Sequence, residues 1–154
     1  MITKTLLATA AAMLLIGPPR IAVQTTDLTG NALAMVTADY HTDEDEARIY
    51  GTLYSINQGQ RVDRSITLEK VGDHRYRVNR TWTGTEPMVL VVGVEQGEGG
   101  KHGAAEALIR VARGGRVAGV DTPTEREGNH TLQRRITQRE INAALDQLGA
   151  RAAD

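Results

Sequence analysis

One short acidic run holds the residues best suited to binding a metal ion. It contains Asp39, His41, Asp43, Glu44, Asp45 and Glu46. Carboxylates are the hard oxygen ligands that calcium prefers, and an imidazole extends the choice to copper. The run lacks the glycine and the final glutamate of an EF-hand loop, so a solvated hairpin loop is the alternative interpretation. The candidate metal ligands are His41, Asp43, Asp45 and Glu46.

The histidines offer a second route to a metal. They are His41, His74, His102 and His130, and no two have the three- or four-residue spacing of a local metal clip. Convergence of His41 and His102 with a methionine, Met35 or Met88, would give a copper site of soft and borderline ligands. Unrelated exposed histidines are the alternative.

Enzymatic chemistry has little support in the sequence. The absence of cysteine excludes thiolate nucleophiles, thiolate metal sites and disulfides. Neither serine, Ser55 or Ser65, lies in a nucleophile elbow. The glycine-rich stretch before Lys101 has Glu95 and His102 where a phosphate loop needs a glycine and a hydroxyl. We therefore predict a protein that is not an enzyme and has no cofactor. A small hydrolase that uses dispersed carboxylates stays open.

The charge balance argues against a nucleic-acid partner. Lysine and arginine number 18 against 19 aspartates and glutamates, so there is no basic footprint. A possible basic stripe consists of Arg61, Arg64, Arg75, Arg77 and Arg80. Acidic residues such as Asp63 and Glu69 lie among these arginines, which favours cross-strand ion pairs over an anion-binding surface.

The elements that position these residues are predicted from hydrophobic periodicity. Residues 88–94 are apolar without alternation, which indicates a strand covered on both faces at the centre of a core. Further strands are predicted at 32–40, 48–56, 61–71, 75–82, 105–113 and 116–121. The pattern predicts an all-β fold, an antiparallel immunoglobulin-like sandwich of about seven strands over residues 30–121. A small barrel is the alternative.

The two ends of the chain have different patterns. Residues 1–22 read as a signal peptide or N-terminal anchor, because the apolar run after Lys4 is too short for a stable membrane span. Residues 122–135 read as a polar linker. Residues 136–149 predict an amphipathic helix, with Thr137 and Glu140 forming a capping box. This helix either covers its own sandwich or docks on a partner.

Residues 61–95 carry a family resemblance. Leu68, Gly72, Tyr76, Val78, Trp82, Gly84 and the strand 89–92 occur in an order that resembles small bacterial extracytoplasmic immunoglobulin-like modules. These include the FixH-like, YtkA-like and carboxypeptidase-regulatory-like domains. The resemblance implies an exported sandwich with an accessory or binding role, and it transfers no functional residue.

The function expected from the sequence is an exported, non-enzymatic β-sandwich accessory or interaction module of the bacterial cell envelope. Its expected location is periplasmic or secreted, and its expected partner is another envelope protein. A periplasmic copper- or calcium-binding protein is the first alternative, and the small hydrolase is the second.

Overall fold

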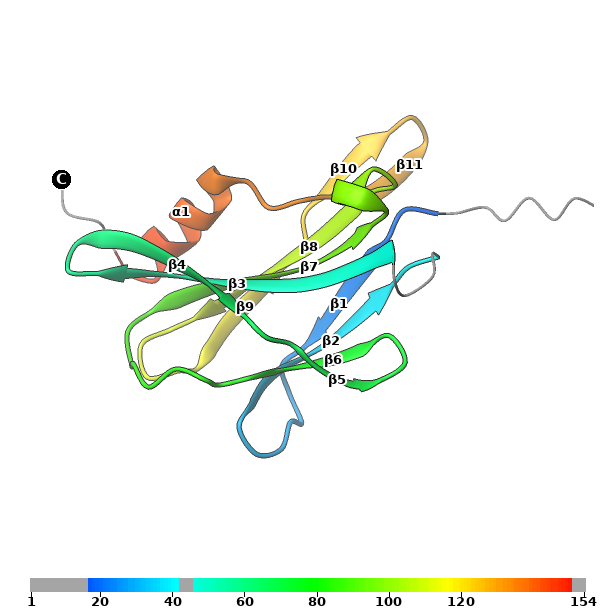
Figure 1. The fold of residues 1–154 in the computed structure, drawn as a ribbon. Helices are drawn as coiled ribbons and strands as arrows, with labels where there is room; N and C mark the ends of the chain where they lie inside the picture. Colours follow the sequence, from blue (N-terminus) through cyan, green and yellow to red (C-terminus); the bar gives the residue numbers. More distant parts are fainter. Residues whose placement is uncertain (1–16, 42–45, 151–154) are drawn as a thin grey trace, which may run out of the picture.

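The computed structural model describes residues 17–41 and 46–150. Within these ranges, two antiparallel sheets face each other (Figure 1). The four-stranded sheet contains, in spatial order, β1 (Arg20–Gln24), β2 (Ala32–Asp39), β6 (Arg75–Asn79) and β5 (Glu69–Gly72). The five-stranded sheet contains β4 (Gln60–Ile66), β3 (Ala47–Asn57), β7 (Met88–Gln96), β8 (Ala104–Val111) and β9 (Val117–Asp121). The remaining elements are the hairpin of β10 (Thr124–Glu127) and β11 (His130–Gln133), the short 3-10 helix η2 (Glu98–Gly100) and the helix α1 (Gln138–Gln147).

The order of the strands is that of an immunoglobulin-like sandwich. The four-stranded sheet, β1-β2-β6-β5, corresponds to the first, second, fifth and fourth strands of that fold. The other sheet adds β9 as a further edge strand beside β8. The predicted all-β antiparallel sandwich is therefore confirmed, with more strands than the seven expected from the sequence.

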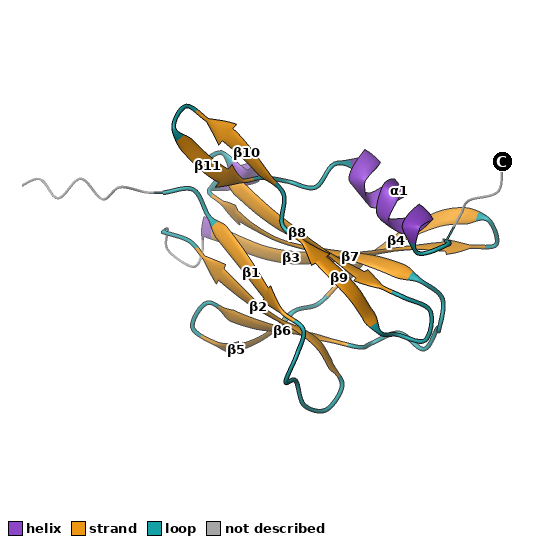
Figure 2. Ribbon diagram, turned by 180° about the vertical axis from the view of Figure 1, so that it is seen from behind, coloured by secondary structure: helices purple, strands orange, loops and turns teal. Residues whose placement is uncertain are grey.

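The hydrophobic core has two layers, one on each face of the five-stranded sheet. Between the sheets, Leu33 and Val36 of β2 pack with Leu90 of β7 in one aliphatic cluster. On the outer face, Val91 of β7 packs against Leu145 of α1 in a second cluster. Figure 2 shows α1 lying across this outer face. The prediction that residues 88–94 are covered on both sides is confirmed, and the helix covers its own sandwich.

The predicted strand 61–71 is in fact two strands in different sheets. The chain leaves the five-stranded sheet after Ile66 and enters the other sheet at Glu69. Gly51 makes this crossing possible, because a Cβ there would lie 2.7 Å from side-chain atoms of both Ile66 and Leu68. Those two side chains fill the space above the glycine and close this side of the sandwich.

The predicted domain boundaries differ from the structure at both ends. β1 pairs with β2 from Arg20 to Gln24, and Ile21 is buried, whereas the sequence pattern places residues 20–22 in the signal segment. The predicted linker 122–135 contains the β10–β11 hairpin. Residues 1–16 lie outside the described residues, so the signal peptide stays a prediction. None of the helices in the described ranges is long and apolar enough to cross a membrane.

If a signal is removed, we expect the mature chain to retain β1. Cleavage after Ala22 would delete the buried Ile21, whose burial contributes roughly 1.5–3 kcal/mol. The intact mass of protein recovered from the cell envelope identifies the first residue. A stable mature protein that begins at Val23 would contradict the pairing of β1 with β2.

Candidate functional site: a buried carboxylate network beside the start of helix α1

The five-stranded sheet buries two glutamates on its outer face. Glu95 of β7 is 5% exposed and Glu106 of β8 is 7% exposed. A buried carboxylate is costly unless it is paired and hydrogen-bonded. The partners of these two side chains therefore decide whether they are available for chemistry.

A row across three strands supplies the first partner of Glu106. Tyr50 of β3 lies opposite Gly93 of β7, and Gly93 lies opposite Glu106. The tyrosine ring crosses over the glycine, and its hydroxyl donates a hydrogen bond to Oε1 of Glu106. A Cβ at Gly93 would lie 2.9 Å from Cγ of Glu106 and closer still to the ring. Only glycine leaves room for this contact.

The hydroxyl of Tyr50 is a permanent donor in this arrangement. Burial is the largest cause that raises its pKa above the usual value, and the hydrogen bond to Glu106 raises it further. Both causes disfavour the phenolate form of the ring. The tyrosine therefore stays protonated and neutral beside the carboxylate throughout the physiological pH range.

The second oxygen of Glu106 holds the segment that leads into α1. Oε2 accepts a hydrogen bond from the N–H of Ile136 at 2.5 Å. The N–H of Glu106 itself donates to the carbonyl of Arg134 at 3.2 Å. Residues 134–136 are thereby fixed along β8, and both oxygens of the buried carboxylate are occupied.

Glu95 is paired with two arginines that reach it from the surface. Its Oε1 lies 2.8 Å from Nη2 of Arg135, and its Oε2 lies 3.4 Å from Nη1 of Arg48. Arg48 is directly opposite Glu95 in the β3–β7 register, whereas Arg135 comes from the segment before α1. The contact with Arg135 anchors the segment before the helix to β7.

The first turn of α1 carries the predicted capping box. The hydroxyl of Thr137 accepts from the N–H of Glu140, and the carboxylate of Glu140 accepts from the N–H of Thr137 at 2.8 Å. Arg134 adds a bidentate contact to Glu140, with distances of 2.8 and 3.0 Å. Chiefly through Arg134, and then through Thr137, the pKa of Glu140 falls to about 2.

The shifted pKa of Glu140 gives stability a defined pH dependence. The folded-state value of about 2 lies below the ordinary value of 4.5, so the stabilisation is complete above pH 4.5 and is lost as the pH falls toward 2. We expect Glu140→Gln to lower stability at neutral pH and to match the wild type near pH 2. Urea unfolding at several pH values measures this difference, and a difference that does not change with pH would contradict the assignment.

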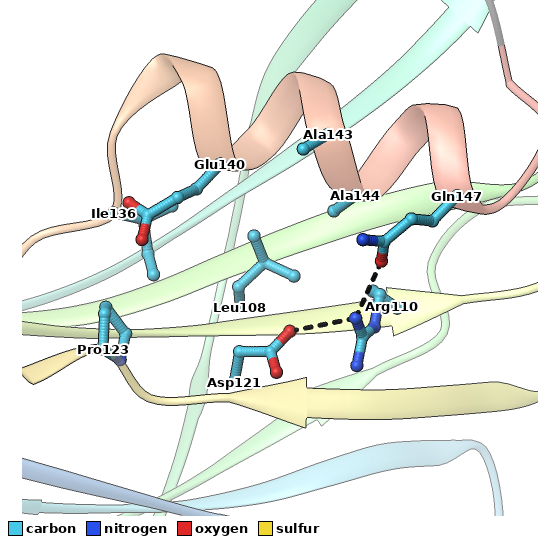
Figure 3. Close-up of a pocket in the computed structure, with 9 residues that line it drawn as sticks. All are labelled: Leu108, Arg110, Asp121, Pro123, Ile136, Glu140, Ala143, Ala144 and Gln147. Atoms are coloured by element: carbon cyan, nitrogen blue, oxygen red, sulfur yellow. Dashed lines mark hydrogen bonds and ion pairs between the residues drawn. The ribbon is translucent and has the colours of Figure 1, made fainter.

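A groove lies between α1 and the strands β8 and β9 (Figure 3). Its volume is about 360 Å³. Leu108 and Ala144 form part of an apolar lining. At one end, Arg110 lies 3.3 Å from Asp121 and donates to Gln147 at 3.0 Å. The groove can therefore accept an apolar side chain beside a fixed polar cluster.

The predicted metal ligands are only partly described. Asp43 and Asp45 lie outside the described residues. His41 is exposed, and its N–H donates to Oε1 of Gln96 at 2.7 Å. The carbonyl of Glu46 accepts from Gly97 at 2.9 Å. Within residues 17–41 and 46–150, no group of three or more His, Asp or Glu side chains could hold a metal ion.

The structure brings two of the residues named in the copper alternative close together and keeps a third apart. The side chain of Gln96 contacts the N–H of His41 and the carbonyl of His102, so these two backbones lie close together. Met88 is buried at the opposite end of β7, away from both. A copper site that combines these histidines with Met88 is therefore wrong.

The metal hypothesis for the acidic run stays a prediction with a direct test. If the run binds calcium, replacing Asp43, Asp45 and Glu46 with their amides should abolish stoichiometric binding, because the amides lack the negative charge that attracts the cation. Isothermal titration with calcium chloride measures the loss. Equal calcium affinity in the wild type and the triple variant would remove the acidic run as a site.

The predicted basic stripe is divided between the two sheets. Arg61 and Arg64 lie on β4, whereas Arg75 and Arg77 lie on β6 of the other sheet. Arg77 forms an ion pair with Glu69, its register partner on β5, at 3.7 Å. The prediction of cross-strand ion pairs is confirmed for this pair.

The buried network is not among the features that the sequence predicts. One signal was present, because Glu95 directly follows the apolar run and Glu106 interrupts another apolar segment. A charged residue in such a position needs a partner, but Tyr50 and Ile136 are 56 and 30 residues from Glu106 in sequence.

No family model, curated protein or solved structure matches this chain. The resemblance to extracytoplasmic modules stays a prediction.

Proposed function

We propose that this chain is an exported, non-enzymatic immunoglobulin-like module of the bacterial cell envelope that acts by binding another envelope protein. The observation that carries the proposal is the use of the buried carboxylates. Each oxygen of Glu95 and Glu106 already has a partner among the described residues. The contacts with Ile136 and Arg135 fix the segment that leads into α1. The ionisable groups thus build a rigid surface.

The groove beside α1 is the surface that fits a protein partner best. Its walls are one helix and two strands, and the contacts of Glu106 with Tyr50 and Ile136 hold the helix in place. A preformed apolar recess with a few fixed polar groups lowers the ordering cost of binding. The expected ligand is therefore an apolar side chain of the partner, seated over Leu108 with Arg110 at one end.

Site-specific photo-crosslinking in the envelope of the native host tests this proposal. A photoreactive residue at Ala143 lies in the groove, whereas the same residue at the exposed Asp146 is a matched control on the same helix. We expect one discrete protein adduct from position 143 and none from position 146. Adducts from neither position, or equal adducts from both, would contradict binding at the groove.

Cell fractionation tests the location in the same experiment. The proposal requires the full-length gene product to appear in the periplasm, the medium or an envelope fraction. Recovery of the folded protein in the cytoplasm alone, with the whole N-terminal segment retained, would overturn export whatever the crosslinking result.

A further inference from the structure

The four outer edges of the two sheets differ in how well they are protected against pairing with another strand. At β1, the side-chain amide of Gln133 covers the edge: it accepts from the N–H of Ile21 at 2.6 Å and donates to its carbonyl at 3.1 Å. β5 has only four residues, and its pairing is irregular between Lys70 and Gly72. The pairing of β9 with β8 shifts its register between Arg110 and Val111. Side-chain cover, short length and irregularity are devices that block edge-to-edge association.

Among the described residues, β4 carries none of these three devices. It is seven residues long, and it pairs with β3 without a register shift from Gly51–Ile66 to Asn57–Gln60. The β3–β4 hairpin extends beyond the four-stranded sheet, with β4 at the free edge (Figure 1). It also carries Val62, which is 41% exposed to solvent. Among the described residues, Val62 and Val71 are the exposed large hydrophobic residues, and Val62 is the more exposed of the two.

The hairpin turn determines which backbone groups of β4 face outward. Gln58 and Gly59 both have positive φ, so Asn57 and Gln60 flank a two-residue turn and form a hydrogen-bonded pair. Such pairs alternate along an antiparallel ladder. The N–H and C=O groups of Arg61 and Asp63 therefore point away from β3, toward the free edge.

We propose that β4 pairs antiparallel with β4 of a second copy of this chain, about a two-fold axis at Val62. In this register the two Val62 side chains face each other. Arg61 of each copy lies opposite Asp63 of the other, in an outward-facing hydrogen-bonded pair. The two five-stranded sheets then form one continuous sheet across the dimer.

Charge complementarity selects this register among the two-fold alternatives. In β4, the backbone groups of every second residue face the free edge, and these residues must pair with their equivalents in the second copy. The two-fold axis therefore passes through a residue of β4 and not between two residues. An axis at Asp63 places two aspartates opposite each other, and an axis at Arg64 places two arginines opposite each other. Like charges that lie directly opposite are destabilising. The axis at Val62 instead creates two opposite-charge pairs and one apolar pair.

Arg61 and Asp63 lie on the same face of the five-stranded sheet. The guanidinium of Arg61 donates to Asn142 of α1 at 2.7 Å and to Gln138 at 2.5 Å, and it lies 4.8 Å from the ring centroid of Tyr54. These contacts keep the side chain on the outer face of the sheet, the same face as Asp63 in the register with β3.

A disulfide trap tests the proposed register. Because the chain has no cysteine, Val62→Cys introduces a single thiol. Facing residues of a non-hydrogen-bonded pair have Cα atoms about 4.5 Å apart, which is within disulfide range. We expect mild oxidation to convert Val62→Cys into a covalent dimer. Val71→Cys, at the other exposed valine on edge strand β5, is the matched control and should stay monomeric.

A proline variant tests the role of the edge itself. The N–H of Asp63 does not bond to β3, so Asp63→Pro should leave the monomer folded while it blocks strand addition. Asp63→Ala is the control that keeps this N–H. Sedimentation equilibrium should show that Asp63→Pro weakens dimerisation at least ~10-fold more than Asp63→Ala does, since it removes an N–H from each half of a symmetric interface.

The outcomes separate a second copy from other occupants. Covalent dimerisation of Val62→Cys but not of Val71→Cys, with weakened association of Asp63→Pro, supports the proposal. The proposal is overturned if the two cysteine variants form disulfide-linked dimers to the same extent. It is also overturned if the wild type stays monomeric at high concentration and Val62→Cys forms no disulfide-linked dimer. A wild-type monomer that captures a different protein through β4 would also overturn it, because the edge would then serve another partner.

Discussion

Replacing Glu106 with alanine is expected to lower the free energy of unfolding by about 3 kcal/mol. The change leaves the hydroxyl of Tyr50 and the N–H of Ile136 without their acceptor, and leaving a buried donor unsatisfied costs about 1–3 kcal/mol. Because Ile136 leads directly into α1, the helix should loosen as well. Urea unfolding, followed by Trp82 fluorescence and by circular dichroism, measures the loss.

Two further variants separate the hydrogen bonds from a general loss of side-chain volume. Glu106→Gln keeps one acceptor oxygen of similar shape, so an intermediate loss is expected. Glu127→Ala removes an exposed carboxylate from β10 and should change stability by less than about 0.5 kcal/mol. A Glu106→Ala protein as stable as Glu127→Ala would show that the network does not hold the helix.

The second large effect is expected at Gly93. Gly93→Ala places a methyl group against the ring of Tyr50 and 2.9 Å from Cγ of Glu106. Overpacking of this kind costs roughly 1–3 kcal/mol, and here it also displaces the hydroxyl from its acceptor. We expect a loss near the upper end of this range in the same urea experiment.

A double-mutant cycle shows whether the cost arises from Tyr50. In a Tyr50→Ala background the ring no longer lies over the glycine, so Gly93→Ala should cost at least about 1 kcal/mol less than in the wild type. Residues in direct contact are expected to be coupled in this way. Equal costs in the two backgrounds would mean that Gly93 is needed for a reason unrelated to the tyrosine.

The local patterns that the sequence predicted correctly depend on neighbouring residues. The unbroken apolar run 88–94 predicted a strand covered on both faces, and both core clusters include it. Thr137 and Glu140 predicted the capping box, and both of its hydrogen bonds are present. Each of these signals is contained within a few consecutive positions.

The errors and omissions depend on contacts between distant segments. β1 was missed because Ile21 and Val23 follow an apolar segment that resembles an export signal. The crossing from β4 to β5 keeps the alternation intact, so nothing local marked the change of sheet. The partners of Glu106 are set by strand register and by the path of the chain into α1.

Native-state hydrogen exchange tests the central claim most directly: α1 is an integral layer of the domain, held by the buried carboxylates. The account predicts that the amide of Ile136 and the central amides of α1 are protected nearly as strongly as those of β7, and that Glu106→Ala removes this protection first. Rapid exchange of Ile136 and α1 in the wild type, with β7 still protected, would contradict the account. The helix would then be a loosely attached element that the buried carboxylates do not hold.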